Sequence, residues 1–385
     1  MAKFKLKDFA KDISVAIKDA QSSPLKQFVG LEHYDSGEPV ITRFTDTSLI
    51  SSSVKEFKEN DILIARRNVY LRRAGIAFFS GLTSGDSIIL RIYDDCEEKT
   101  GIPKEDAIKI LPFILNSNDF WNYANKHADG MNSKRISKDM LYDYEFDLPS
   151  LSEQKILADK LWAAYRLKES YKKLLAATDE MVKSQFIEMF GDPMVNTKCW
   201  SDYGQIGNYA QIVLGSTPNS KNPDYWDGEI KWITPAEMAD ESYYIYDTER
   251  HLTEEGLSSA SLTLLPYRSV LFSTRAPIGK VGLVGSPMYC NQGFKNFICG
   301  EKLNPVYLYY ALIFKREYLV SLGTGTTFKE LSKKAVENLM IAVPPIALQN
   351  EFEAIYQQAD KSKFELRKSI DAIDVVIKSL INDIK

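Results

Sequence analysis

Apolar side chains recur at steps of three and four residues along two stretches of the chain, residues 149–189 and 344–384. This period is that of an amphipathic α-helix. Neither stretch holds Gly or Pro after its opening prolines, and Gly191-Asp192-Pro193 follows the first, so each predicts one unbroken helix. About 36 residues at a rise of 1.5 Å give a rod of roughly 54 Å. The predicted buried stripes are Leu157, Leu161, Ala164, Leu167, Tyr171, Leu174 and Met181 in the first helix, and Phe352, Tyr356, Ala359, Leu366, Ile370, Ile373, Ile377, Leu380 and Ile384 in the second.

The two helical stretches are copies of one another at a fixed offset of 195 residues. Pro149 matches Pro344, Gln154 matches Gln349, and the register continues upstream, where residues 134–151 align with 329–346. A chance similarity would not hold one register over so long a stretch, so the chain contains an internal repeat. An apolar stripe of this length must be covered, and we expect the other copy to cover it in an antiparallel coiled coil. Two unrelated helices facing solvent would leave both stripes exposed.

The segments before the helices differ from them in pattern. Residues 1–147 and 194–342 carry short β-rich runs separated by Gly, Pro, Asn and Ser. They resemble each other loosely, because Asp61–Arg67 occupies the place that Ser269–Arg275 has in the second copy. The pattern therefore predicts an α+β chain in which two globular α/β domains alternate with two long helices in a pseudo-two-fold repeat. The predicted segments are 1–147 (first globular domain), 148–193 (first helix), 194–342 (second globular domain) and 343–385 (second helix).

Composition places the chain among globular proteins without membrane spans. Its 385 residues are 44% hydrophobic and 26% charged, and no apolar run approaches the roughly 20 residues of a membrane helix. The first residues are amphipathic and resemble no signal peptide, so we expect a cytoplasmic protein. The four cysteines form no CxxC pair and do not cluster with the three histidines. We therefore expect reduced, buried thiols and no metal site.

Charge gives no support to a nucleic-acid function. The formal net charge is -4, and residues 1–147 hold 21 basic against 23 acidic side chains. Most nucleic-acid-binding domains are basic. Any phosphate contact must therefore come from local clusters.

Three patterns resemble those of enzymes, and each has a simpler interpretation. Asn222–Tyr225 is similar to the tetrapeptide with which amino-methyltransferases hold adenine, but Asp stands at its third position and a Pro-Asp turn explains it better. Asp224 and Glu229 would have to converge on one Mg²⁺ to form a nuclease site, which needs an unusual hairpin. Gly323–Gly325 lacks the third glycine of a dinucleotide loop and fits a loop before a helix. We expect no catalytic residue in this chain.

Clusters of basic and polar side chains are better candidates for binding. Arg66–Arg73 places four guanidinium groups and one tyrosine within eight residues, between two β-like runs. Arginine forks match phosphate oxygens or the O6/N7 edge of guanine, and Asn pairs with adenine. The simpler interpretation is a solvated turn in which Arg stems cover a sheet face. The corresponding sets in the second half, Ser273–Arg275 with Lys280 and Thr326–Lys329, are ordinary on their own.

The chain resembles the specificity subunit of type I restriction-modification enzymes. In the second half the similarity rests on Gly215–Pro218, Lys221–Trp226, Ile233–Pro235, Val270–Lys280, Asn291–Lys295 and Gly325–Ser332. The helical regions contribute Leu148–Gln154, Met189–Pro193 and Val343–Gln349. The first half is less typical and matches through Asp61–Asn68 and the region of Ser84–Asp86. The second helix has Ala347-Leu348 where the first has Ser152-Glu153, so the first turns of the two helices need not make identical contacts.

The resemblance implies recognition without catalysis. Each globular domain would bind one half of a bipartite, asymmetric site in double-stranded DNA, while the paired helices fix the spacer and dock two modification subunits. Those subunits would hold S-adenosylmethionine and methylate adenine, and a restriction subunit would supply ATP- and Mg-dependent cleavage. This chain itself would bind no cofactor, metal or membrane. The expected DNA-binding residues are Arg66, Arg67, Asn68, Tyr70, Arg72, Arg73, Lys134, Arg135, Thr217, Asn219, Lys221, Thr274, Arg275, Lys280, Asn291, Gln292, Lys295, Thr326, Thr327 and Lys329. The expected docking residues are Gln154, Leu157, Leu161, Gln349, Phe352 and Tyr356.

Two other classes of function remain open at this point. A scaffold that pairs proteins through its helices predicts globular domains without DNA-sequence preference. An enzyme using Asn222–Lys231 predicts that alanine at Asp224 and Glu229 abolishes activity.

Overall fold

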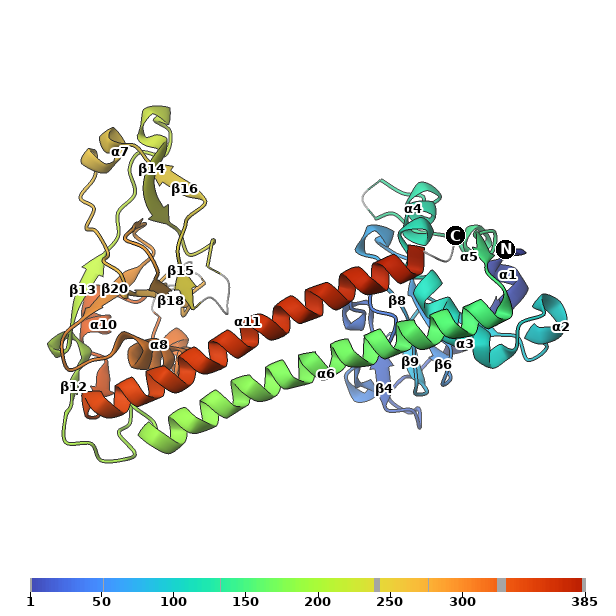
Figure 1. Cartoon of the computed structure of the whole chain (residues 1–385), viewed down its shortest axis with the longest axis horizontal. Coiled ribbons are helices and arrows are strands. Elements are labelled where there is room, and N and C mark those ends of the chain that lie inside the picture. Colours follow the sequence, from blue (N-terminus) through green and yellow to red (C-terminus); the bar gives the residue numbers. More distant parts are fainter. Residues whose placement is uncertain are drawn as a thin grey trace. The chain divides into compact units, whose positions relative to one another are not determined.

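Two long helices dominate the computed structural model (Figure 1), which describes residues 2–50, 52–131, 133–238, 243–275, 277–323 and 330–382. Helix α6 runs from Leu151 to Phe190 and helix α11 from Ile346 to Asn382. Both match the helices expected from the sequence pattern. Gly191 ends α6 in the left-handed conformation (φ 67°), with its N–H donating to the carbonyl of Ile187.

The two helices begin differently, as the sequence difference in their first turns suggests. At α6 the backbone N–H of Ser150 donates to the Glu153 carboxylate and the Ser150 hydroxyl accepts from the Glu153 N–H, which is a capping box. Leu348 stands at the place of Glu153 in α11, so the second copy lacks that carboxylate. The two N-termini nevertheless share a further contact. The side chain of Gln154 donates to the carbonyl of Pro149, and that of Gln349, at the same position of the repeat, donates to the carbonyl of Pro344.

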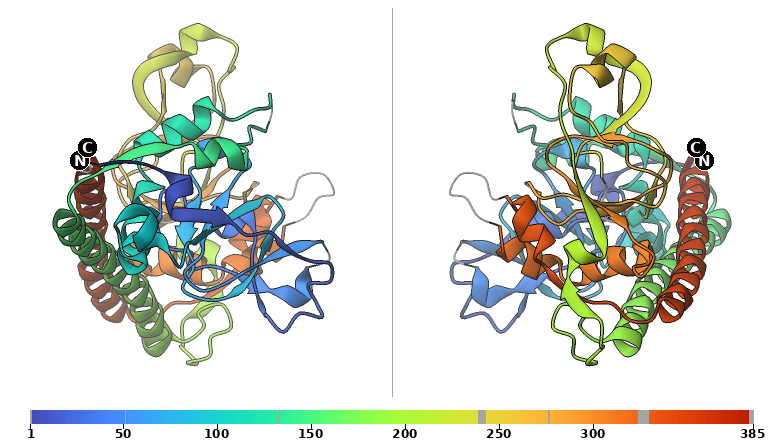
Figure 2. Two further views of the ribbon diagram at one scale, coloured as in Figure 1. Left: turned by 90° about the vertical axis from the view of Figure 1, so that its right-hand side faces the viewer. Right: turned by 90° about the vertical axis from the view of Figure 1, so that its left-hand side faces the viewer.

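The helices pack side by side and antiparallel (Figure 2). Lys168 of α6 contacts Asp374 of α11 at 2.5 Å, and Lys363 of α11 contacts Asp179 of α6 at 2.8 Å. Lys168 and Lys363 occupy the same repeat position, as do Asp179 and Asp374, so one ion pair is made twice by the duplicated sequence. Both lysines are buried. The offset of 195 residues is therefore reproduced in the helix pairing.

The chain folds as two compact units, each of which takes part of both helices. Unit 1 comprises residues 1–173 and 366–385, and unit 2 comprises residues 174–365. The helices thus do not form a layer of their own. Within each unit, a part of α6 and a part of α11 pack against the core of that unit's globular part.

The described residues of unit 1 form three sheets, which are connected by short helices. A four-stranded antiparallel sheet has the order β2-β10-β7-β8, a five-stranded sheet has the order β3-β6-β9-β4-β5, and β1 pairs with β11. The strands are β1 (Ala2–Lys5), β2 (Ala10–Asp12), β3 (Val15–Ile17), β4 (Gln27–Val29), β5 (Thr45–Asp46), β6 (Val54–Phe57), β7 (Ile62–Ala65), β8 (Ala74–Ile76), β9 (Gly81–Ser84), β10 (Ser87–Ile92) and β11 (Glu145–Leu148). The helices are α1 (Leu6–Phe9), α2 (Cys96–Thr100), α3 (Lys104–Ile114), α4 (Asn118–Lys126) and α5 (Lys138–Tyr142), with 3₁₀ turns η1 (Leu31–His33), η2 (Thr47–Leu49) and η3 (Val69–Leu71).

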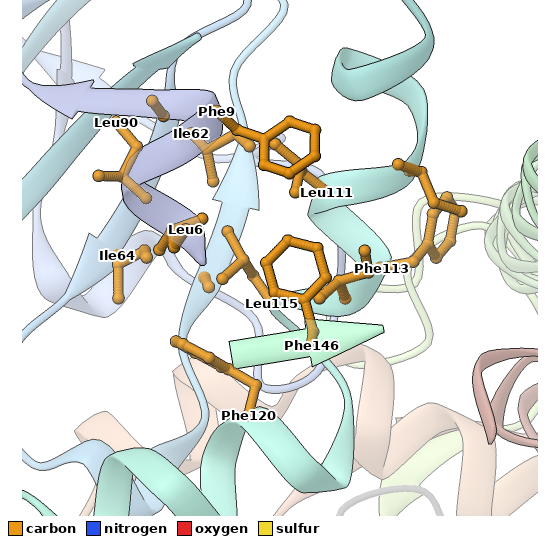
Figure 3. Packing of buried hydrophobic residues seen from close by; sticks show 14 of the residues in the cluster. Leu6, Phe9, Ile62, Ile64, Leu90, Leu111, Phe113, Leu115, Phe120 and Phe146 are labelled. Atoms are coloured by element: carbon orange, nitrogen blue, oxygen red, sulfur yellow. The ribbon is translucent and has the colours of Figure 1, made fainter. Parts of the chain in front are cut away.

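The core of unit 1 lies between its four-stranded sheet and helix α3. Ile62, Ile64 and Leu90 of the sheet meet Leu111 and Leu115 of this helical region (Figure 3). Phe9, Phe120 and Phe146 close the cluster. Leu161 and Tyr165 of α6 and Ile381 of α11 belong to the same core. Apolar burial therefore attaches both long helices to the globular part of this unit.

Three sheets are also formed by the part of unit 2 that the structure describes. Their orders are β13-β20-β17-β18-β15, β16-β14-β19 and β12-β21. The strands are β12 (Tyr203–Gln205), β13 (Ala210–Leu214), β14 (Trp226–Ile233), β15 (Tyr244–Ile245), β16 (Arg250–Leu252), β17 (Val270–Phe272), β18 (Val281–Val284), β19 (Tyr289–Cys290), β20 (Lys295–Cys299) and β21 (Met340–Ala342). The helices are α7 (Glu254–Ser258), α8 (Pro305–Phe314), α9 (Arg316–Ser321) and α10 (Lys333–Glu337), with 3₁₀ turns η4 (Ile206–Asn208) and η5 (Pro223–Tyr225).

Aromatic side chains attach the long helices to unit 2. Phe186 and Phe190 of α6 lie within 5.5 Å of Phe352 of α11, measured between ring centroids. Both also contact Tyr307 of α8. All four rings are fully or almost fully buried, and such pairs add roughly 0.5–1.5 kcal/mol beyond their buried area.

The repeat is visible in the globular parts as well. In each unit the first strand pairs antiparallel with the strand that precedes the long helix, β1 with β11 and β12 with β21. Helices α5 and α10 begin 195 residues apart, which is the offset of the repeat. The hydroxyls of their N-cap residues, Ser137 and Ser332, each accept a hydrogen bond from the backbone N–H of the third residue that follows. The predicted α+β repeat with an antiparallel helix pair is confirmed.

Two expectations about burial were wrong. Leu167, Leu174 and Met181 were assigned to the buried stripe of α6, yet each is about half exposed. The reason is that the buried face runs instead through Gln154, Ala158, Leu161, Tyr165 and Lys168, so polar residues occupy inward positions that a hydrophobic pattern does not count. Of the four free cysteines, Cys96 and Cys290 are buried as expected, whereas Cys199 is exposed in a turn.

Replacing Lys168 by Met should destabilise unit 1 by about 2 kcal/mol near neutral pH, because it removes two charge-assisted hydrogen bonds, to Glu38 and Asp374. Burial raises the pKa of the Glu38 carboxyl, but hydrogen bonds from Lys168 and Lys172 outweigh burial and hold that pKa below its ordinary value. A carboxyl with a lowered pKa stabilises the fold above its ordinary pKa and loses this contribution as the pH falls through the folded value.

Urea unfolding at neutral and acidic pH checks this prediction. The stability of Lys168→Met should fall less steeply with acid than that of the wild type. Lys173→Met, at an exposed position of the same helix, is the matched control and should behave as wild type. Equal acid sensitivity of Lys168→Met and wild type would contradict the assigned role of Lys168.

Candidate nucleic-acid interface

The arginine-rich segment of unit 1 forms a tight turn between β7 and β8. Its centre is the 3₁₀ turn η3, and the flanking residues Asn68 (φ 55°) and Arg72 (φ 51°) adopt the left-handed conformation. Asn tolerates this conformation better than most residues, whereas an arginine there is uncommon. The turn displays Tyr70, whose side chain is 60% exposed.

The arginine side chains of this turn differ in their hydrogen-bond partners. Arg73 donates to the backbone carbonyls of Leu31 and Arg67, and Arg72 donates to the Asn118 side chain. These two side chains therefore brace the turn. Arg66 is partly buried, and its backbone N–H and carbonyl join the turn to Asp86 and Ile136.

Arg67 and Arg135 form an accessible cationic pair in unit 1. Arg67 lies 3.7 Å and Arg135 3.6 Å from the same carboxylate oxygen of Asp86. The Nε of Arg67 also donates to the hydroxyl of Ser133. The two arginine side chains are 45% and 42% exposed, so both can reach a ligand. The structure thus brings two predicted residues together from segments that lie far apart in the sequence.

A corresponding charged cluster lies in unit 2. Glu330 accepts from Nε of Arg275 and from Nζ of Lys295, both at 2.9 Å. Lys295 is buried and also donates to the Thr274 hydroxyl, whereas the Arg275 side chain is 47% exposed. Burial opposes ionisation of Glu330, but hydrogen bonds from Lys295 and Arg275 outweigh it and lower the pKa of the carboxyl. Glu330 is therefore ionised at neutral pH.

This cluster forms one wall of a hollow of ≈ 600 Å³. The hollow is open and mixed in polarity, and its lining residues are Leu214, Gly215, Arg275, Gln292, Lys295, Glu330, Ser332 and Lys333. Thr217 donates to the Gln292 side chain at its edge. Three predicted residues, Arg275, Gln292 and Lys295, meet here with a fourth, Thr217, beside them.

Two tryptophans hold the loop that carries the remaining predicted residues of unit 2. The indole N–H of Trp232 donates to the carbonyl of Ser216, and that of Trp226 donates to the carbonyl of Asn219. The Arg250 guanidinium stacks on the Trp226 ring at 3.5 Å from its centroid. The loop backbone is thus fixed at two points, while the side chains of Asn219 and Lys221 are exposed.

Several residues predicted to bind DNA have internal roles instead, which corrects the prediction for them. Thr274 and Lys295 are buried, and Lys280 donates to the backbone carbonyl of Met238. Asn291 is partly buried and accepts from the N–H of Gly293 within its own turn. Arg73 braces η3 through two backbone carbonyls. The predicted residues that retain accessible polar groups are Arg67, Tyr70, Lys134, Arg135, Thr217, Asn219, Lys221, Arg275 and Gln292. Thr326, Thr327 and Lys329 lie outside the described residues.

The six predicted docking residues face inward. Leu161, Phe352, Tyr356, Gln154 and Gln349 are buried, and Leu157 is partly buried against the core of unit 1. Gln349 accepts from the N–H of Asn304 and donates to the Lys302 carbonyl, so it fastens α11 to unit 2. The five buried side chains are not accessible to a partner protein. The accessible apolar side chains of α6 are Ile156, Leu167, Leu174, Met181 and Ile187.

The first enzyme-like pattern forms ordinary local structure. The Asn222 side chain accepts from the Asp224 N–H and begins the 3₁₀ turn η5, as the simpler interpretation held. Within the described part of the chain, no three His, Cys, Asp or Glu side chains group so that they could hold a metal ion. Of the third pattern, Gly323 is described, whereas Thr324 and Gly325 lie outside the described residues.

Sequence reasoning missed Asp86 and Glu330 as members of the two clusters. A signal was present for Glu330, because the offset of 195 places it at the repeat position of Arg135. No pattern pointed to the contact of Asp86 with both arginines, since it depends on how β7, β10 and the segment before α5 meet.

Comparisons with known proteins agree on one family. The family model of the type I restriction modification DNA specificity domain matches residues 200–373. The type I restriction enzyme MjaIX specificity subunit of Methanocaldococcus jannaschii is 36% identical over 166 residues, which cover 42% of this chain and 38% of that subunit. The putative MjaX specificity subunit of the same organism is 23% identical over 295 residues, which cover 71% of this chain and 67% of that protein.

A solved structure shares the fold. The type I restriction-modification S subunit from M. genitalium superimposes with a TM-score of 0.57 at 12% identity, covering 99% of this chain and 94% of that one. None of the described helices is long and apolar enough to span a membrane.

Proposed function

We propose that this chain is a type I restriction-modification specificity subunit and that each of its two units binds one half of a bipartite site in double-stranded DNA. The observation that carries this proposal is that both units present an accessible arginine beside a carboxylate. Arg67 in unit 1 and Arg275 in unit 2 follow corresponding strands, and their surroundings differ in sequence. Equivalent backbone positions that are surrounded by different side chains are suited to the recognition of two different half-sites.

The chain acts in this proposal by binding alone. The accessible polar side chains of each cluster would contact base edges or phosphates of one half-site. Because the net charge is -4, nonspecific attraction to the phosphate backbone is weak, and partner subunits would supply part of the phosphate contact. Those partners are two modification subunits carrying S-adenosylmethionine, joined by a restriction subunit that uses ATP and Mg.

The exposed apolar side chains of α6 supply the proposed docking surface. Leu167, Leu174 and Met181 are spaced by seven residues, which places them along one side of the helix. Helices of a modification subunit could bury this row. It replaces the inward-facing residues as the part of α6 that a partner covers.

Alanine substitutions of the two arginines test the proposal. Arg67→Ala should weaken binding through one half-site and Arg275→Ala through the other, each by about 1–3 kcal/mol, because each removes one guanidinium contact. Binding of the full chain with its modification subunits to its cognate duplex, and to duplexes with either half-site scrambled, measures this.

The controls are Arg43→Ala in unit 1 and Lys302→Ala in unit 2, whose exposed cations pair with Asp35 and Asp202 away from the clusters. These should bind as wild type does. The proposal fails if Arg67→Ala and Arg275→Ala leave the affinity unchanged, or if both weaken binding to scrambled and cognate DNA equally.

A further inference from the structure

The two charged clusters occupy the same place in the two units. Arg67 forms an isolated antiparallel bridge with Arg135, and Arg275 forms one with Glu330. The hydrogen bonds beside them also correspond: Ile136 N–H donates to the Arg66 carbonyl, and Leu331 N–H donates to the Thr274 carbonyl. Arg67 and Arg275 are thus equivalent positions, as are Arg135 and Glu330.

The carboxylate of each cluster comes from a different segment. In unit 1 it belongs to Asp86, whose backbone carbonyl accepts from the N–H of Arg66. The equivalent carbonyl in unit 2, which accepts from the N–H of Thr274, belongs to Gly293. The carboxylate of unit 2 instead stands on Glu330, where unit 1 has Arg135. One carboxylate therefore lies between two cations at this place in each unit, although the position that supplies the carboxylate differs between the units.

A carboxylate in this place fixes the orientation of the arginine beside it. Arg275 donates to Glu330 through Nε, and its half-exposed side chain lines the open hollow. The guanidinium is a rigid planar fork, so holding one edge sets the direction of the other. Paired guanidinium nitrogens match O6 and N7 of guanine.

The same carboxylate disfavours contacts that carry no sequence information. It places a negative charge beside the arginine, and since like charges repel, this charge weakens the attraction of a phosphate group to the guanidinium. Sequence-independent affinity comes from neutralised phosphates. An oriented arginine beside a fixed carboxylate therefore favours a base edge over the phosphate backbone.

We propose that Asp86 and Glu330 are positioning residues that determine sequence discrimination, Asp86 through Arg67 in one half-site and Glu330 through Arg275 in the other. This inference rests on the proposed DNA-binding function. The contacts of Glu330 are hydrogen bonds of 2.9 Å, whereas those of Asp86 are ion pairs of 3.6 and 3.7 Å. Glu330 therefore restricts its arginine more, and its removal should have the larger effect.

The test selects bound sequences from a random duplex library, using the full chain with its modification subunits. Wild type should return a two-part motif. Glu330→Gln should make one half degenerate and lower the ratio of specific to nonspecific affinity about tenfold, while the other half is unchanged. Asp86→Asn should make the other half of the motif degenerate, with a smaller fall in the ratio of specific to nonspecific affinity. Both variants should bind a duplex without the motif at least as tightly as wild type at one salt concentration, because a negative charge has been removed.

The controls are Glu301→Gln and Asp95→Asn, which change exposed carboxylates outside the clusters and should return the wild-type motif. Arg275→Lys provides a second variant that keeps the charge but loses the fork, and it should lose discrimination as Glu330→Gln does. An unchanged motif with an unchanged affinity ratio in Glu330→Gln, or an equal loss of specific and nonspecific binding, overturns the inference. A wild-type complex that returns no two-part motif overturns the proposed function itself.

Discussion

Inserting seven residues into both long helices is expected to lengthen the spacer of the recognised site by about three base pairs and to leave both half-sites unchanged. Seven residues add about 10.5 Å of helix, and B-DNA rises about 3.4 Å per base pair. The insertions belong between Lys168 and Asp179 in α6 and between Lys363 and Asp374 in α11. Both ion pairs between the helices then survive, since each lies outside the inserted turns.

A single insertion in α6 is the matched control. It shifts one ion pair relative to the other by about two turns, so the helices cannot satisfy both, and we expect loss of assembly rather than a new spacer. Methylation-site mapping of the double insertion gives the spacer directly. If the double-insertion variant is folded and active but its spacer is unchanged, the helices do not fix the length of the spacer.

Phe352→Ala is expected to destabilise unit 2 by about 3–5 kcal/mol. The ring is fully buried and contacts Phe186, Phe190 and Tyr310, with centroid separations between 5.2 and 5.5 Å. Truncation leaves a cavity among rigid rings that cannot collapse into it. Denaturation monitored by circular dichroism measures the loss.

Phe364→Ala, on the same helix, is the control for Phe352→Ala. Its side chain is 62% exposed, so its removal should change the stability by less than about 0.5 kcal/mol. A large loss of stability at Phe364, or a negligible one at Phe352, would contradict the packing of α11 against unit 2. The pair also separates stability from docking, because a residue needed only for docking would leave the unfolding of the isolated chain unchanged.

The sequence predicted the long helices and their pairing because their period and repeat are local properties. The ends of α6 and a part of the strands, β7, β8 and β10 in unit 1 and β17, β18 and β20 in unit 2, followed from apolar spacing and from Gly and Pro positions. The buried face of α6 was misjudged since Lys168 and Gln154 point inward. Their burial depends on partners such as Glu38 and the Pro149 carbonyl, which a hydrophobic pattern does not reveal.

The candidate site was predictable only in part. Arg67 and Arg275 could be found because their residue types and their place after a strand suggest binding. Arg73 and Lys280 have the same residue chemistry, but backbone carbonyls occupy their cationic groups. Asp86 could not be assigned from sequence, because its contact with a distant arginine exists only once the sheets and the segment before α5 have assembled. For Glu330 the repeat did offer a signal, since the offset of 195 residues places it at the position of Arg135.

Recognition of two different half-sites at a fixed separation can be tested by mapping methylated adenines in DNA from cells that carry this chain with modification subunits. We expect one asymmetric, two-part motif with a spacer of constant length, absent from cells that lack the chain. Methylation at a single continuous motif, or methylation that does not depend on this chain, would contradict such recognition.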